Sequence, residues 1–237
     1  MANHEKTYLQ PISYSKESSD EVKRFKSLPK ELRLGNYWDD LENGSLKFLK
    51  SEIKNHYLQQ QGHTCAYCQQ KIIVEHGAAW DTDHIIPKDS HPDFMFEAEN
   101  LCITCKDCNN TKRAKNVLRN QKRVKFPNKP GDYIFCHPHF HNYKEHIRVV
   151  RVAALYIPRT PEGIKTIEIC GLMRFSLKFA NYEYSDTGNS LKIHELSSEL
   201  ISAESSTERA AILNMIATLV RDGLDNASRS GLASRGM

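Results

Sequence analysis

The sequence predicts an α+β fold: a small zinc-stabilised core with flanking helices and a C-terminal region of β-hairpin and helix. Two Cys-x-x-Cys pairs supply four thiolates, the ligands that zinc favours in structural sites. The 36 residues between the pairs include two runs typical of strands, residues 83–87 and 101–104. A polar stretch that favours a helix follows the last cysteine. The four expected ligands are Cys65, Cys68, Cys105 and Cys108.

Cys102 leaves a second pairing open, because Cys102-x-x-Cys105 has the same spacing. We prefer Cys105 with Cys108, since a strand residue at position 102 would point its side chain into the core of the hairpin. Cys136 and Cys170 lie among apolar neighbours and are expected to be small buried side chains. Seven cysteines, an odd number, without an export signal favour a reducing compartment, so we expect a cytoplasmic protein.

The length of 237 residues, with 39% hydrophobic residues, allows one or two domains with a buried core. We divide the chain into an N-terminal arm (1–40), a domain that contains both cysteine pairs (41–130), an α/β accessory region (131–222) and a disordered tail (223–237). No apolar run reaches the length of about eighteen residues that a transmembrane helix needs, so no membrane partner is expected.

A helix is expected ahead of the first cysteine pair, from a cap at Ser45 to about Gln61, with Gly62 at its end. Its apolar residues recur at helical spacing and would pack against the back of the core. They are Leu46, Leu49, Ile53 and Tyr57.

The accessory region has three predicted elements. Residues 147–157 and 164–169 are rich in β-branched residues and predict a hairpin, followed by a short helix over 171–181. Ser205 and Glu208 have the spacing of a capping box, and the apolar stripe behind them predicts a terminal amphipathic helix. A face that covers its own core and a face that binds a partner are both compatible with that stripe, and we favour the core.

Residues 106–129 contain nine Lys or Arg residues against the single acid Asp107, and a basic helix is expected from 109 to about 123. Clustered cations gain affinity for nucleic acid by releasing condensed counterions. A solvated helix face is the alternative. A second dense segment, residues 135–146, is rich in histidine. A further metal site is conceivable there, but a loop that packs back on the core explains the segment better, because no carboxylate lies close by.

Four residues occur in a fixed order beside the cysteine pairs: Asp83, His84, Asn100 and Asn109. This arrangement resembles the HNH endonucleases, also called ββα-metal nucleases, in which a two-stranded hairpin and a helix hold one catalytic divalent cation. The last position is Asn, so the chain is similar to the H-N-N version of the pattern. The resemblance implies an HNH nuclease domain over residues 41–130 that hydrolyses DNA phosphodiester bonds.

The resemblance also implies a role for each residue. His84 would be the general base, and Asp83 and Asn109 would ligate Mg²⁺ or Mn²⁺, hard cations that prefer oxygen donors. Asn100 would brace the loop that carries His84. The zinc would be structural, since four thiolates leave no open coordination position. Asp81 is treated as a bystander. The expected contacts to DNA phosphates are Lys112, Arg113, Lys115 and Arg119.

Residues 132–182 are similar to the tail of HNH proteins that act with an ATPase in two-gene phage-defence systems of the Septu and retron-associated kind. That likeness implies an ATPase partner and an effector that the partner controls. A non-catalytic zinc module that binds nucleic acid or protein is the alternative from a different class. Such a module would have no need of Asp83, His84 and Asn109 together.

Overall fold

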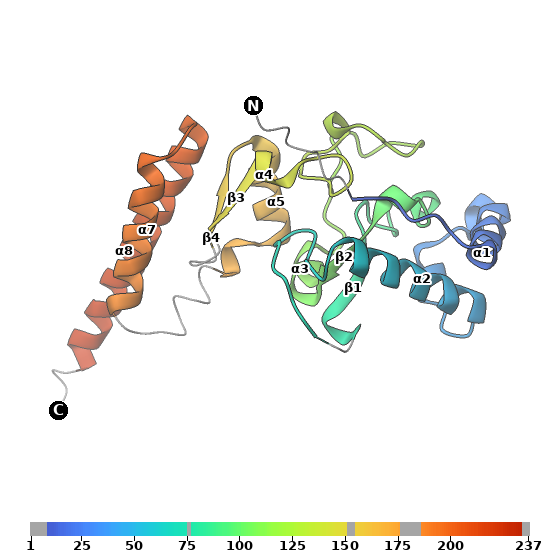
Figure 1. The fold of residues 1–237 in the computed structure, drawn as a ribbon, viewed down its shortest axis with the longest axis horizontal. Helices are drawn as coiled ribbons and strands as arrows, with labels where there is room; N and C mark the ends of the chain where they lie inside the picture. Colours follow the sequence, from blue (N-terminus) through green and yellow to red (C-terminus); the bar gives the residue numbers. More distant parts are fainter. Residues whose placement is uncertain (1–8, 75–76, 151–154, 176–185, 234–237) are drawn as a thin grey trace. The chain divides into compact units, whose positions relative to one another are not determined.

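The computed structural model describes residues 9–74, 77–150, 155–175 and 186–233 (Figure 1). The chain separates into two compact units, the first made of residues 1–143 with 168–171 and the second of residues 144–167 with 172–237. The main boundary therefore follows residue 143, where we expected one after residue 130. In the described part of the chain, none of the helices combines the length and the apolar character that crossing a membrane requires.

The first unit begins with helix α1 (Lys16–Ser27), in the segment where we expected an arm. Ser15 caps the helix, because its hydroxyl accepts a hydrogen bond from the N–H of Ser18. The N–H and the hydroxyl of Ser15 also donate to the carboxylate of Glu52, at 2.9 and 3.0 Å. Phe25 is buried against Phe96, with ring centroids 5.1 Å apart. These contacts make α1 an integral part of the unit.

Helix α2 (Gly44–Gln60) confirms the helix predicted before the first cysteine pair. Its cap is Asn43, whose side-chain oxygen accepts from the N–H of Leu46 at 3.0 Å. Gly62 follows the end of the helix with a positive φ of 53°, a conformation that glycine adopts without strain. The predicted stripe is completely buried and anchors α2 on the core: Leu46, Leu49, Ile53 and Tyr57.

The hairpin and helix follow in ββα order, although the first strand lies at residues 80–84 and not at the predicted 83–87. Strand β1 (Trp80–His84) pairs antiparallel with β2 (Leu101–Cys105), and Asp83 lies opposite Cys102. Helix α3 (Lys106–Lys112) starts directly after β2. The second cysteine pair therefore bridges the end of the hairpin and the first turns of the helix.

The basic helix expected over 109–123 is wrong at both ends, since α3 covers only Lys106–Lys112. It stops because Arg113 takes a positive φ of 47°. Farther along, the side chain of Asn116 bonds the main chain of Leu118 in both directions, at 2.8 and 3.0 Å. Such local hydrogen bonds compete with a helix. The nine cations therefore do not share one helical face.

The second unit contains β3 (Ile147–Val150), which pairs antiparallel with β4 (Leu155–Pro158). The short α4 (Tyr143–His146) precedes β3. The single strand that we predicted over 147–157 covers β3 and all of β4 except Pro158, and its residues 151–154 lie outside the described residues. A hairpin is thus confirmed, but with its second strand placed earlier in the chain.

The strand predicted over 164–169 is wrong, because these residues belong to helix α5 (Pro161–Cys170). The hydroxyl of Thr160 accepts from the N–H of Gly163 at 3.2 Å and so caps the helix. Thr166, Ile167 and Cys170 are buried at helical spacing, so packing overrides the β propensity of the isoleucines. Of the short helix predicted over 171–181, residues 176–181 lie outside the described residues.

Helices α7 (Asp186–Ile201) and α8 (Ser206–Ala233) lie side by side (Figure 1). The capping hydroxyl is confirmed, since Ser205 accepts from the N–H of Glu208 at 3.1 Å. The apolar stripe of α8 covers the core of its own unit, in a cluster that includes Leu155, Ile157, Leu196, Ile212, Met215 and Leu219. Helix α8 continues to Ala233, through residues for which we expected a disordered tail, and residues 234–237 lie outside the described residues.

Candidate active site and metal centre

Four sulfur atoms converge at the base of the hairpin, all within 4.8 Å of one another: those of Cys65, Cys68, Cys105 and Cys108. The sulfurs of Cys68 and Cys105 are 3.9 Å apart. A tetrahedral zinc ion with bonds of about 2.3 Å sets its sulfurs about 3.8 Å apart, so the set fits zinc. Hydrogen bonds from the three neighbouring thiols, that of Cys108 above all, hold the pKa of Cys105 well below its usual range.

Cys102 stands outside this cluster. Its sulfur lies in the hairpin core, where it donates to the hydroxyl of Tyr67 at 3.8 Å. The structure therefore supports Cys105 with Cys108 as the second pair. In the described part of the chain, these four cysteines are also the one group of three or more His, Cys, Asp or Glu side chains placed closely enough to hold a metal ion.

The histidine-rich segment packs on the first unit. The two ring nitrogens of His139 bond the main-chain oxygens of Leu9 and Leu101, at 3.0 and 2.8 Å. The ring of His137 stacks on Phe140, with centroids 4.4 Å apart. These contacts fit a loop folded back on the core, as we preferred.

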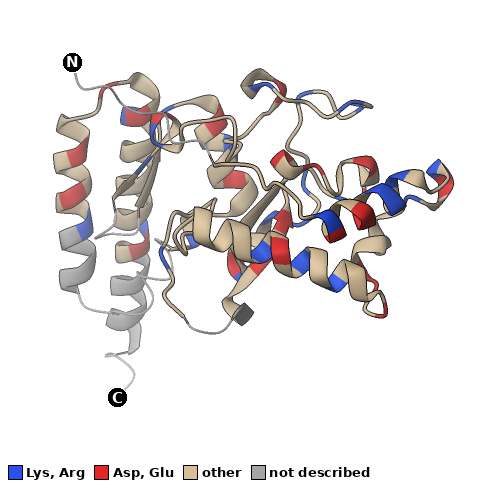
Figure 2. Ribbon diagram, turned by 45° about the vertical axis from the view of Figure 1, so that its right-hand side comes forward, with Lys and Arg blue, Asp and Glu red and all other residues tan. Residues whose placement is uncertain are grey.

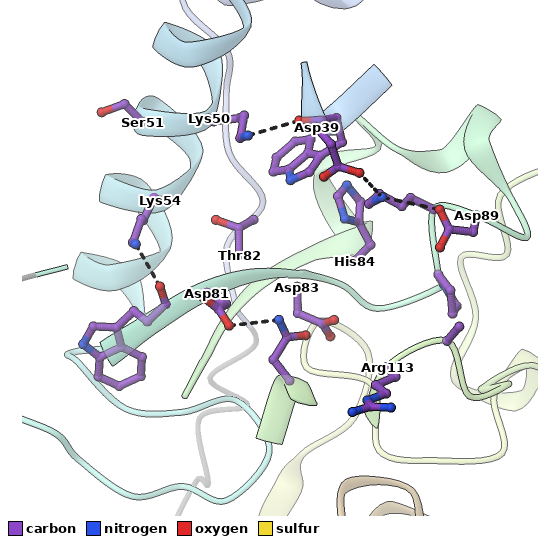
Figure 3. Close-up of a pocket in the computed structure, with 16 residues that line it drawn as sticks. Asp39, Lys50, Ser51, Lys54, Asp81, Thr82, Asp83, His84, Asp89 and Arg113 are labelled. Carbon is purple, nitrogen blue, oxygen red and sulfur yellow. Dashed lines mark hydrogen bonds and ion pairs between the residues drawn. The ribbon is translucent and has the colours of Figure 1, made fainter. Parts of the chain in front are cut away.

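A cavity of about 770 Å³ lies between α2, β1 and the end of α3 (Figure 3). Asp83, His84 and Asn109 all line it, although Asp83 and His84 alternate on β1 and start on opposite faces of the strand. Asn100 does not line the cavity. Three of the four predicted catalytic residues therefore meet at one opening.

His84 is buried at this cavity. The ring edge of Trp38 contacts it, with centroids 4.5 Å apart. One ring nitrogen bonds the main chain of Met95, whereas Nε2 has no hydrogen-bond partner among the described residues. Burial, reinforced by the charges of Lys88 and Lys112, lowers the pKa of His84 to about 3. The imidazole is therefore neutral, and an anion bound beside it would raise its pKa and its basicity.

Asp83 is held by two buried residues. The hydroxyl of Tyr67 donates to its Oδ2 at 2.5 Å, and the ammonium of Lys112 lies 3.1 Å from Oδ1 and 3.0 Å from Oδ2. Lys112 also donates to the main-chain oxygen of His84 at 2.9 Å. We expected Lys112 to contact DNA, but its side chain is completely buried.

Tyr67 was missed by the sequence reasoning, although its place inside the first cysteine pair was a signal that its position would be fixed. Burial, more than the nearby charge of Asp83, raises the pKa of Tyr67 well above its usual range. The hydroxyl therefore keeps its proton and acts as a donor to the carboxylate.

Asn109 is oriented by Asp81. The amide nitrogen of Asn109 donates to Oδ2 of Asp81 at 3.1 Å (Figure 3). Oδ1 of Asp81 pairs with Lys106 at 3.2 Å. The hydrogen bond to Oδ2 directs the amide nitrogen to Asp81 and leaves the amide oxygen for a cation. Asp81, which we treated as a bystander, fixes the orientation of a predicted ligand.

Asn100 braces the connection between the strands. Its side-chain oxygen accepts from the N–H of Ile86 at 2.7 Å, and its amide nitrogen donates to the main-chain oxygens of Ile86 and Phe94, at 3.1 and 3.0 Å. The side chain is completely buried. Asn100 therefore ties the residues after β1 to those before β2, while its part in the reaction stays a prediction.

The cations that border the cavity differ from the predicted set. Arg113 lines it, whereas Lys115 and Arg119 do not, and Lys115 donates to the main-chain oxygen of Ile169. Lys50 and Lys54 of α2 line it instead, and their spacing of four residues on one helix was the signal that we overlooked.

The donors at the cavity suit a hard cation. The carboxylates of Asp81 and Asp83 and the amide of Asn109 all present oxygen, which Mg²⁺ and Mn²⁺ prefer to the sulfur donors of the cysteine cluster. The oxygen donors at the cavity and the sulfur donors of the cysteine cluster thus differ in the kind of cation that they suit.

Residues 65–115 match the family model of the HNH endonucleases. The chain therefore contains an HNH endonuclease domain, in the α+β arrangement that the sequence predicted, with a cysteine cluster positioned to bind a metal. The chain is also similar to the Septu protein PtuB of Bacillus thuringiensis, with 27% identity over 185 residues, 72% of this chain and 70% of PtuB. The likeness extends well beyond residues 132–182. No solved structure gives a significant match.

Proposed function

We propose that this chain is an endonuclease that hydrolyses DNA phosphodiester bonds with one divalent metal ion and His84 as general base. One observation carries the proposal: a neutral imidazole with an unpartnered nitrogen shares a cavity with the oxygen donors of Asp83 and Asn109. Phosphodiester hydrolysis needs these two elements, a base for the attacking water and ligands for a cation.

Each residue has a defined part in the reaction. Nε2 of His84 accepts a proton from the water that attacks phosphorus, while the contact with Trp38 fixes the ring. Asp83 and Asn109 would hold Mg²⁺ or Mn²⁺, which when bound supplies positive charge beside the phosphate. Asp81 keeps the oxygen of Asn109 turned toward that position. Asn100 keeps the end of β1, and with it His84, in place.

DNA contacts are proposed at the walls of the cavity. Lys50 and Lys54 donate to the main-chain oxygens of Trp38 and Trp80, at 3.1 and 2.8 Å, which holds their ammonium groups in place (Figure 3). Acidic and basic residues are mixed along α1 and α2 (Figure 2). We therefore assign Lys50, Lys54 and Arg113 as phosphate contacts because they line the cavity, since the distribution of charge over the helices does not distinguish them. Lys115 and Arg119 would reach flanking phosphates only.

The similarity to a Septu protein supports a role in anti-phage defence. We propose that the chain is the nuclease component and that an ATPase encoded beside it is the partner. The second unit lies entirely outside the matched residues 65–115, and we propose it as the region that contacts such a partner.

Cleavage of supercoiled plasmid with Mg²⁺, in the presence and absence of the neighbouring ATPase, tests the proposal with His84→Ala. Loss of a general base lowers the rate by about 10²- to 10⁴-fold, while zinc content should remain that of the wild type. His91→Ala is the matched control, because this histidine lies on the same connection but outside the cavity lining. Equal cleavage by the wild type and His84→Ala would refute the assignment.

A further inference from the structure

The two segments that carry the sulfur cluster also carry the two residues that hold Asp83. Tyr67 lies between Cys65 and Cys68, and Lys112 lies on α3, one helical turn after Cys108. Both side chains are completely buried, and Asp83 is 5% exposed. The segment of each cysteine pair thus supplies one side chain, Tyr67 or Lys112, that contacts the carboxylate of Asp83.

Lys112 has no capacity left for a phosphate. Its ammonium lies 3.1 and 3.0 Å from the two oxygens of Asp83 and donates to the main-chain oxygen of His84 at 2.9 Å. It also lies over the ring of Tyr67, 5.9 Å from the centroid. A buried cation with these contacts fixes its neighbours and does not bind substrate.

We propose that Tyr67 and Lys112 are positioning residues for Asp83, and that the sulfur cluster acts on the reaction through them. The inference rests on the proposed function, in which Asp83 ligates the cation. Tyr67 and Lys112 together engage both carboxylate oxygens and fix the plane of the group, so the remaining lone pairs keep one direction.

The metal cluster is what makes this support rigid. Tyr67 lies between two cysteines of the cluster, Cys65 and Cys68, so its main chain has little freedom when both sulfurs are bound to the metal. Cys108 in the same way fixes the turn of α3 that leads to Lys112. Zinc would therefore do more than hold the fold together: it would set the orientation of a catalytic carboxylate at a distance.

Tyr67→Phe tests the proposal, with Tyr133→Phe as the matched control. Both tyrosines are completely buried, and each hydroxyl donates one hydrogen bond, to Asp83 at 2.5 Å and to the main-chain oxygen of Pro127 at 2.7 Å. Loss of the bond to the neutral carbonyl should lower the melting temperature of full-length Tyr133→Phe by about 2–4 °C, and loss of the bond to the carboxylate should lower that of Tyr67→Phe somewhat more. A merely structural role would destabilise both variants but leave the binding of Mn²⁺ unchanged in both.

The decisive readout is binding of Mn²⁺, followed by the loss of the electron paramagnetic resonance signal of free Mn²⁺. Tyr67→Phe should bind Mn²⁺ about tenfold more weakly than the wild type, with the same zinc content by elemental analysis. Tyr133→Phe should bind it as the wild type does. Equal Mn²⁺ affinity of Tyr67→Phe and Tyr133→Phe, in an otherwise active protein, would overturn the positioning role alone.

Lys112 is tested by a double-mutant cycle with Asp83→Asn and Lys112→Met. Each single change leaves a buried charge without its partner, so the double variant should melt above at least one single variant. Additive losses of melting temperature would overturn the role of Lys112. If the wild type neither binds Mn²⁺ nor cleaves DNA with the ATPase present, the proposed function is wrong and this inference falls with it.

Discussion

Each of the two hairpins of this chain is associated with a buried carboxylate that pairs with a cation, but the surroundings of the two carboxylates differ. In the first unit, Asp83 of β1 pairs with the ammonium of Lys112. In the second, Glu208 pairs with Arg148 of β3 at 3.0 Å and with Arg159 at 3.6 Å. Asp83 borders the cavity, whereas Glu208 is 1% exposed and lies outside its lining. Asp83 is therefore placed to meet a ligand in the cavity, as the proposed function requires, whereas Glu208 meets only the two arginines.

The hairpins also differ in what holds them together. The β1–β2 hairpin is fixed by four sulfurs and the side chain of Asn100. The β3–β4 hairpin is covered by apolar side chains of α7 and α8. Stability should therefore depend on metal in the first unit and on packing and the arginine–glutamate pairs in the second. Both tryptophans, Trp38 and Trp80, belong to the first unit, so their fluorescence reports on that unit alone.

The largest effect should come from Cys65→Ser, which breaks the metal-dependent unit. Structural zinc contributes about 10–16 kcal/mol in small zinc domains, so this variant should lose zinc and show the tryptophan emission of unfolded protein. Helical circular dichroism from the second unit should persist. The control is Cys102→Ser, which should keep a full complement of zinc. Zinc loss in Cys102→Ser together with zinc retention in Cys108→Ser would show that the pairing is wrong.

A smaller effect is expected from Glu208→Gln, which breaks the other unit. Removing the carboxylate leaves Arg148 and Arg159 without their buried partner, and because both arginines are partly solvated the loss should be about 2 kcal/mol. The transition followed by circular dichroism should shift, while that followed by tryptophan emission stays. Glu199→Gln, which removes a more exposed partner of Arg148, should cost less. A common shift of both probes would argue against two independent units.

The smallest effect concerns pH. Burial first, and then the charges of His139 and His141, lower the pKa of His137 well below its usual value. In the unfolded chain His137 binds a proton near pH 6.5, and in the folded state it does not, so His137 by itself should cost the first unit about 1 kcal/mol between pH 6.5 and 5.5. His84, whose pKa is lowered to about 3, adds a loss of its own that stays in a His137 variant. His137→Asn, whose oxygen can replace Nδ1 as the acceptor for the N–H of His139, should weaken this dependence. Urea unfolding followed by tryptophan emission measures it, and identical pH dependence in both proteins would exclude His137 as the cause.

The sequence predicted the elements that depend on local pattern. The stripe of α2 follows from helical spacing, and the structure has it. The hairpin is also present, although its first strand covers Trp80–His84 where residues 83–87 were predicted. Spacing left two possible partners for Cys105, and the expected direction of the Cys102 side chain favoured Cys108, which the sulfur cluster supports. Asn100 was recognised through the family pattern, and its three hydrogen bonds give the physical reason for its place.

The errors arose where tertiary contacts decide. Residues 164–169 favour strands by composition, but the cap at Thr160 and the buried face of α5 make them helical. The charge of Lys112 suggested a surface residue, yet the partner that buries it, Asp83, lies 29 positions away in the sequence. Tyr67 carries no charge, and its place inside the first cysteine pair fixes its position without revealing its partner, Asp83, 16 positions away. Long-range partners of this kind cannot be read from spacing.

Trp38 sets a limit on how small a working fragment can be. The residues that match the HNH family begin at position 65, but the indole that contacts His84 and the helix that supplies Lys50 and Lys54 both precede that point. A fragment restricted to the matched residues would expose the imidazole of His84 to water and would lack the side of the cavity that Trp38, Lys50 and Lys54 line. Any attempt to transplant or shorten this domain should therefore start upstream of Trp38, well before the first cysteine.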